Sequence, residues 1–141
     1  MWTYCGKEFN PDEDELKDWV GFVYLLTDNE NDKKYIGKKS FWRKITRPPL
    51  KGKKRKRRSI AESDWKDYYG SSEEVGAIVE EFGGDRFTRE ILHLCHSRGE
   101  MSYLELKEQV DRKALLREDY YNRIIQCRIH ANHIKNLQKN D

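Results

Sequence analysis

Two tyrosines, Tyr24 and Tyr35, precede a dense run of lysine and arginine in this chain. Gly37 follows the second tyrosine and leaves room for a ligand to approach the backbone closely, and Lys38 and Lys39 come next. Cations beside a phenol lower its pKa, which is ordinarily about 10, and a phenol with a lowered pKa can take a proton from an attacking water. These residues predict a site that binds and attacks a phosphate. A cross-strand aromatic pair that only stabilises a sheet is the structural alternative.

The basic run is long and uninterrupted by acidic residues. From Lys38 to Arg58 the chain has 12 lysines and arginines and no aspartate or glutamate, so this segment carries +12 and the rest of the chain carries −9. A local basic block on an acidic body indicates a polyanionic partner, and we expect that partner to be a nucleic acid rather than a membrane surface, because no apolar helical face accompanies the charge. The candidate nucleic-acid contacts are Lys38, Lys39, Lys51, Lys53, Lys54, Arg55, Arg57 and Arg58.

A β-hairpin must position the two tyrosines. Apolar strings on either side of a polar turn segment predict two antiparallel strands, Trp19–Leu26 and Lys34–Lys38. A turn centred between residues 29 and 30 places Tyr24 directly opposite Tyr35, on one face of the sheet.

Other elements follow in the order basic loop, helix, strand and helix. We expect a third strand over Phe87–Cys95, and helices over Pro11–Asp18 (capped by Asn10), Ser40–Thr46, Glu73–Phe82 (capped by Ser71 or Ser72) and Tyr103–Leu116 (capped by Ser102). The fold class is therefore α+β: a single domain with a small three-stranded antiparallel sheet flanked by helices. Residues 1–18 form an acidic N-terminal lead-in, and residues 19–141 form the domain, with a mobile basic loop at 47–58.

The hairpin resembles the GIY-YIG nuclease family, whose members include homing endonucleases. Tyr24 closes a relaxed form of the first motif, GFVY, and Tyr35, Ile36 and Gly37 match the second motif letter for letter. The separation of 11 positions between the tyrosines is usual in that family. The resemblance spans about Gly21–Asn122 and implies a metal-dependent DNA endonuclease, with Mg²⁺ or Mn²⁺ as the cofactor. The resemblance implies that Tyr24 or Tyr35 activates the attacking water. Family analogy favours Tyr24 as the base, with Tyr35 helping to orient it, and the sequence leaves both choices open.

The resemblance implies further site residues. The family places a metal-binding glutamate on the helix after the third strand, where Glu105 is our first choice and Glu108, one turn later, is the alternative. Asn122 stands where the family has a late asparagine that orients the metal shell or the second tyrosine. As a plain loop or cap residue it needs no function.

The arginine of the family is harder to find. Its usual position, ten residues past Tyr35, is Ile45 in this chain. We take Arg43 as the catalytic arginine, with Arg47, Arg57 and Arg58 as alternatives, and Lys38 as a second cation for the phosphate. A different metal site is also considered: Cys127, His130 and His133 are spaced by three and would share a helix face that binds zinc.

The setting follows from composition. No apolar run approaches the roughly 18 residues of a membrane span, and the acidic N-terminus is unlike a signal peptide. The three cysteines are widely spaced, so we expect a reducing, cytoplasmic compartment. The compact and highly charged form of the chain suggests a phage or mobile-element origin. A chain of 141 residues has no room for a separate DNA-binding module, so we expect a free-standing nuclease, or one that forms a homodimer or uses a partner protein for double-strand cleavage. The alternative function is a non-catalytic nucleic-acid-binding protein.

Overall fold

The computed structural model describes residues 1–138 and is built on a five-stranded sheet in the order β2-β1-β7-β3-β4. Strands β3 (Gly21–Asp28), β4 (Lys34–Ser40) and β7 (Phe87–Cys95) pair antiparallel, as the sequence predicted. The expectation of only three strands is wrong, because β1 (Trp2–Tyr4) pairs in parallel with β7 and β2 (Lys7–Glu8) pairs with β1.

The first residues join the sheet through a buried tryptophan. Trp2 is only 2% exposed, and its indole N–H donates to the carbonyl oxygen of Trp65 over 2.8 Å. Cys5 and Gly6, both with positive φ, make the tight turn from β1 to β2. A three-residue strand held by contacts this distant in sequence leaves no periodic signal in an acidic segment, so the sequence did not predict it.

The β3–β4 hairpin is shifted by two residues from the predicted register. Tyr24 pairs with Gly37, and Leu26 pairs with Tyr35. The loop is longer than expected because Asp28 accepts the backbone N–H of Glu30 and its own N–H donates to the Lys33 carbonyl. The two tyrosines still share a face, as diagonal rather than direct neighbours, with ring centroids 6.3 Å apart.

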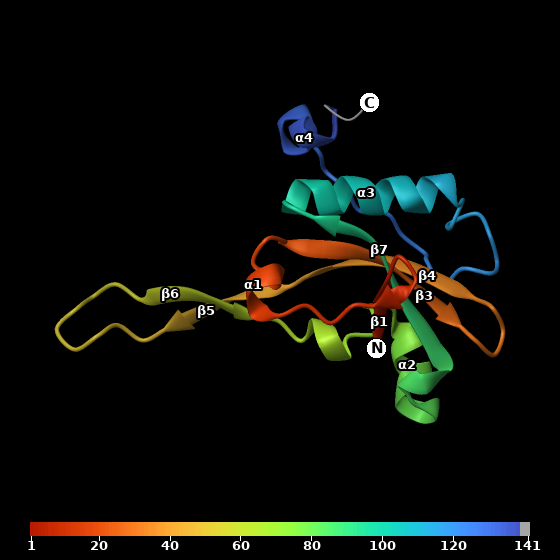
Figure 1. The fold of residues 1–141 in the computed structure, drawn as a ribbon, viewed down its shortest axis with the longest axis horizontal. Coiled ribbons are helices and arrows are strands. Elements are labelled where there is room, and N and C mark those ends of the chain that lie inside the picture. Colours follow the sequence, from red (N-terminus) through yellow and green to blue (C-terminus); the bar gives the residue numbers. More distant parts are fainter. Residues whose placement is uncertain (139–141) are drawn as a thin grey trace.

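Two cores cover the two faces of the sheet, because side chains alternate along β3. Phe22, Tyr24 and Leu26 enter an aromatic core with Trp2 and Trp65. Val23 and Leu25 enter an aliphatic core beneath α3. In Figure 1, α3 lies along one face of the sheet, while α2 lies on the other side.

The helices on the two faces were predicted with different success. Helix α2 (Glu73–Phe82) has the predicted bounds, and Ser72 caps it by accepting the N–H of Val75. Helix α3 covers Arg98–Asp111 instead of Tyr103–Leu116, because Ser97 caps it by accepting the N–H of Glu100. Ser97 and Glu100 form an S-x-x-E start signal that we overlooked.

The remaining elements are short. Helix α1 is limited to Glu13–Leu16 and is capped by Asp12 rather than Asn10, because the Asp12 carboxylate accepts the N–H of Glu15. Three 3-10 turns and a last helix complete the chain: η1 (Trp65–Asp67), η2 (Gly84–Arg86), η3 (Ala131–Ile134) and α4 (Lys135–Gln138). The last three residues of the predicted domain lie outside the described residues. No helix among the described residues is both long and apolar enough to cross a membrane.

A second, two-stranded sheet extends from the body. Strands β5 (Trp42–Arg47) and β6 (Arg57–Glu62) pair antiparallel, and we call residues 42–62 the arm. Figure 1 shows the arm projecting away from the main sheet. The predicted helix over Ser40–Thr46 is therefore wrong, and the predicted basic loop is the tip of a hairpin with strand at both ends. The β-formers Trp42, Ile45 and Thr46 favour a strand there.

Candidate active site

A cleft of about 290 Å³ lies at the outer edge of β4, which is the last strand of the sheet. One wall comes from Tyr35 together with Ser71, at the start of α2. Glu105 and Gln109 of α3 form the wall on the other side of the sheet edge. The cleft is therefore the place where side chains from both faces of the sheet meet around β4.

The two tyrosines differ in their access to this cleft. Tyr35 lines it, is partly exposed, and its hydroxyl lies 3.0 Å from the Ser71 hydroxyl. Tyr24 is 1% exposed and packs beneath the strand, so that a Cβ placed on Gly37 would clash with its hydroxyl. The glycine of the YIG motif is thus required by the packing of Tyr24 against the backbone of β4.

Burial raises the pKa of both phenols. At Tyr24 desolvation is the largest cause, and the neighbouring Tyr68, Tyr35 and Glu105 raise the pKa further, well above its ordinary value. At Tyr35 burial also raises the pKa, against the opposing effect of the hydrogen bond to Ser71.

The prediction that adjacent lysines lower these pKa values is therefore wrong for the free protein. The two lysines are engaged elsewhere: Lys38 donates to the Ser102 hydroxyl over 2.7 Å, and Lys39 forms a salt bridge of 2.7 Å with Asp64. Lys38 lines the cleft, whereas Lys39 lies away from it, with its ammonium group over the ring of Tyr68.

The two candidate glutamates occupy different environments. Glu105 lines the cleft, where burial raises the pKa of its carboxyl group and the nearby Lys38 partly opposes that shift. Glu108 is bound on both oxygens, at 2.8 Å to His93 and 2.8 Å to Arg112, and these contacts keep its pKa below the ordinary value despite burial. Of the two, only Glu105 has a carboxylate that faces the cleft.

Gln109 is a cleft residue that sequence reasoning missed. It follows Glu105 by one helical turn and is 3% exposed, and its buried side-chain oxygen has no hydrogen-bond partner among residues 1–138. Buried polar atoms are nearly always paired, so this oxygen is a candidate contact for a ligand that enters the cleft. The only sequence signal was its i,i+4 spacing from Glu105.

Asn122 closes the open edge of β4 from outside. Its side-chain oxygen accepts the N–H of Ile36 over 3.0 Å, and its amide N–H donates to the carbonyl of the same residue over 2.8 Å. Asn122 thus takes the place of a neighbouring strand and fixes the backbone between Tyr35 and Gly37. Both of its side-chain hydrogen bonds are made to the backbone of Ile36, the residue that follows Tyr35 in β4.

The predicted arginines lie outside the cleft. Arg43, Arg47, Arg57 and Arg58 are exposed residues of the arm, and none of them lines the cleft. The cleft arginine is Arg123, which follows Asn122 and donates to the carbonyl oxygens of Tyr120 and Asn122. Its position directly after the predicted asparagine was the signal that sequence reasoning did not use.

The residues considered for zinc do not form a site. Cys127 lies against the Ser102 carbonyl, and the N–H of His130 donates to the ring of His133. Among residues 1–138 there is no group of three histidine, cysteine or acidic side chains arranged to hold a metal ion.

Comparison with known proteins shows the family to which the chain belongs. No curated protein and no solved structure matches the chain. A family model described as the GIY-YIG domain of the putative endonuclease segE matches residues 2–125, from β1 to the segment that follows Asn122. Because that match covers most of the chain, the protein belongs to the GIY-YIG endonuclease family.

Proposed function

We propose that this endonuclease hydrolyses DNA phosphodiester bonds in the cleft at the edge of β4, with the help of one divalent cation. The observation that carries the proposal is that a single cleft is lined by a phenol, a carboxylate and a cationic side chain, namely Tyr35, Glu105 and Lys38. Phosphodiester hydrolysis needs a group that handles the attacking water and positive charge that stabilises the phosphate.

The donor set fits a hard divalent cation such as Mg²⁺ or Mn²⁺. Magnesium takes oxygen ligands, keeps several waters and needs only one or two carboxylates from the protein. Glu105 would supply the carboxylate, and the unpaired amide oxygen of Gln109 would supply a second oxygen for the cation or its water shell. When bound, the cation neutralises charge on the phosphate and lowers the pKa of a nearby phenol, favouring the phenolate.

The residues of the chain have distinct roles in this proposal. Tyr35 orients the attacking water and takes its proton, and Ser71 fixes the rotation of the Tyr35 hydroxyl. Lys38 and Arg123 bind the phosphate oxygens, replacing the catalytic arginine expected at Arg43. Asn122 and Tyr24 are positioning residues: one holds β4 from outside, and the other supports it from beneath.

The test is cleavage of supercoiled plasmid at low salt, with Mg²⁺ or Mn²⁺ against EDTA. Wild type is compared with Glu105→Gln and with Glu108→Gln, which makes the same chemical change one turn away. We expect metal-dependent nicking or linearisation, lost in Glu105→Gln while DNA binding remains. Glu108→Gln should retain cleavage and lose stability, because its contacts with His93 and Arg112 are structural.

Two results would contradict the proposal. Cleavage that survives in Glu105→Gln but not in Glu108→Gln would exchange the roles of the two glutamates. Tight, salt-sensitive binding by a wild type that converts no plasmid with any divalent cation would favour the non-catalytic binding function.

A further inference from the structure

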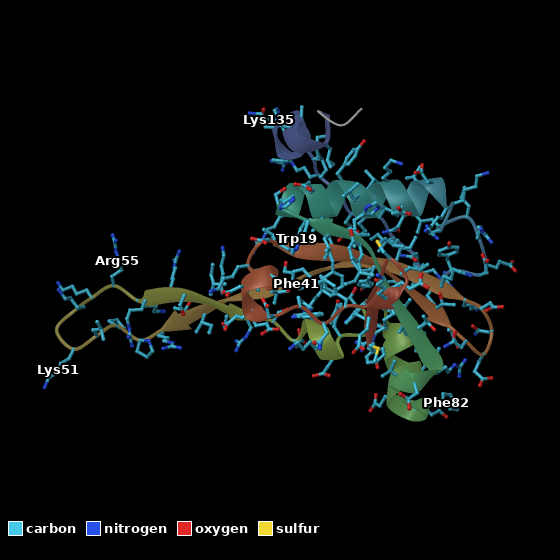
Figure 2. All side chains as sticks on the ribbon, in the orientation of Figure 1. Trp19, Phe41, Lys51, Arg55, Phe82 and Lys135 are labelled. Atoms are coloured by element: carbon cyan, nitrogen blue, oxygen red, sulfur yellow. The ribbon has the colours of Figure 1, made fainter. Side chains whose placement is uncertain are left out.

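The arm carries ten cationic side chains that form no salt bridge with any described residue. Residues 43–58 include ten lysines and arginines, and the segment 42–61 contains no acidic residue. Within residues 1–138, none of these ten side chains makes a salt bridge. Figure 2 shows the labelled side chains of Lys51 and Arg55 at the tip, pointing into solvent far from the body.

The two-stranded hairpin of the arm is also expected to have low stability by itself. A two-stranded hairpin outside a core is marginally stable, and like charges directly opposite on paired strands destabilise it further. Arg47 is paired directly with Arg57, and both are exposed. A polyanion between or beside such guanidinium groups would reduce their repulsion. The charge pattern of the arm therefore indicates an anionic binding partner.

The two faces of the ribbon are chemically different. The register puts Arg43, Ile45, Arg47, Arg57, Ser59 and Ala61 on one face, which we call the arginine face. The opposite face holds Lys44 and Arg58 together with the bulky Trp42 and Ile60 and the only carboxylate of the arm, Glu62. The arginine face therefore has three guanidinium groups, no aromatic side chain and no acidic residue, whereas the opposite face has one guanidinium group, a tryptophan and a glutamate.

The root of the arm is joined to β4, the strand beside the cleft, and is held there by hydrogen bonds. Phe41, fully buried, is the single residue between β4 and β5. Its carbonyl accepts the N–H of Ser63 over 2.7 Å, and the indole of Trp42 donates to the Trp19 carbonyl over 2.9 Å. The arm thus starts four residues after Lys38 and has a defined place relative to the cleft.

We propose that the arm is a DNA-recognition ribbon that enters the major groove beside the cleavage position, with its arginine face toward the base edges. The major groove, about 12 Å wide, accepts a two-stranded β-ribbon, and arginine forks match the acceptor edge of guanine. This proposal rests on the proposed function only in taking duplex DNA as the ligand. It goes further by assigning the DNA groove that the arm enters, the face of the arm that meets the bases, and the side of the scissile phosphate on which this contact lies.

The length of the arm sets the reach of this contact. Six residues of β5 span about 20 Å at roughly 3.3 Å per residue, the length of about six base pairs. The paired strands of the arm therefore cover about six base pairs, all on one side of the scissile phosphate.

The test measures binding in EDTA, so that it does not depend on cleavage. The probes are two duplexes of one sequence, one of them with pyrimidines that carry a bulky substituent on C5, which fills the major groove. We expect wild type to bind the substituted duplex at least about tenfold more weakly. Netropsin, which occupies the minor groove, should compete much less.

Two charge-matched double variants test the face assignment. Arg47→Gln with Arg57→Gln removes two cations from the arginine face, and Lys44→Gln with Arg58→Gln removes two from the opposite face of the same ribbon. Only the first should lose its discrimination between the two duplexes. Circular dichroism spectra like that of wild type confirm that both variants are folded.

Equal binding of both duplexes by wild type would overturn groove insertion, and equal losses in the two double variants would overturn the face assignment. Failure of the proposed function has a different signature: groove discrimination would persist in EDTA while no divalent cation supported plasmid cleavage.

Discussion

At the scale of single side chains, Gln109 combines a structural cost with a role in the cleft. Its buried amide oxygen has no partner in the described part of the chain, an arrangement that typically costs about 1–3 kcal/mol of folding free energy. We expect Gln109→Met, a change of similar length and shape, to raise the free energy of unfolding by about 1 kcal/mol and to weaken metal-dependent cleavage. Chemical denaturation and a titration of nicking against Mg²⁺ concentration check the two effects. A variant that is less stable and cuts normally would contradict both.

The two phenols can also be separated at this scale. Tyr35→Phe removes the hydroxyl that faces the cleft and should slow cleavage by a factor of about 100 or more, as expected for loss of a general base, with little change in stability. Single-turnover cleavage with saturating DNA measures the rate. A larger loss of rate in Tyr24→Phe, at unchanged stability, would transfer the reacting role to the buried phenol.

At the scale of elements, a buried charge network holds the β3–β4 hairpin. The fully buried Asp28 accepts hydrogen bonds from Arg86, at 2.7 and 3.0 Å, and from the Tyr121 hydroxyl, at 2.8 Å. Burial alone would raise the pKa of this carboxyl group, but these hydrogen bonds outweigh it, and the pKa lies below its ordinary value. Ionised Asp28 therefore stabilises the fold at neutral pH.

The sign of this shift predicts a pH dependence. The stabilisation is present above the unfolded pKa of about 4 and is lost as the pH falls through the lower folded value. We expect Asp28→Asn to reduce the free energy of unfolding by roughly 1–3 kcal/mol at pH 7, and the difference from wild type to shrink in acid below about pH 4. Denaturant titrations across this range check it, with the exposed Asp85→Asn as the matched control. A difference that is constant down to the acid limit would refute the role of the charge.

Elements with local signals were the predictable part of the fold. Helix α2 and strand β7 have their predicted bounds because serine caps, glycine stops and an apolar run of β-formers are local in sequence. The register of the hairpin, by contrast, depends on side-chain hydrogen bonds made by Asp28 inside the loop. Strand β1 depends on pairing with β7, which is distant along the chain. The cleft residues differ in the same way. Tyr35 and Glu105 could be predicted from the spacing of the family motifs. Arg123 and Gln109 are recognised as cleft residues only from the packing of α3 and of the segment after Asn122 around β4.

At the scale of the whole molecule, the body and the arm divide two tasks. The body holds both cores and the cleft, and the arm carries a net charge of +9, whereas the rest of the chain carries −6. The sequence indicated this charge asymmetry but assigned it to a mobile loop, because a run of cations has no apolar periodicity to reveal a strand. The division predicts that affinity for DNA and the chemical step can be changed independently.

Removing the arm tests this division of tasks. Trp42 and Glu62 are paired at its root, so an Asn-Gly turn between them can replace residues 43–61 without disturbing the hydrogen bonds of Phe41 and Ser63. We expect nearly unchanged thermal stability, because the removed side chains are outside both cores. Affinity for duplex DNA should fall, and the slope of log K against log salt should flatten by about 0.9 for each phosphate that the shortened protein no longer neutralises.

At low salt and saturating DNA, the chemical step should persist, since every cleft residue remains. An unchanged salt slope would mean that the arm does not bind DNA, and loss of the chemical step in a stable variant would mean that the arm completes the active site.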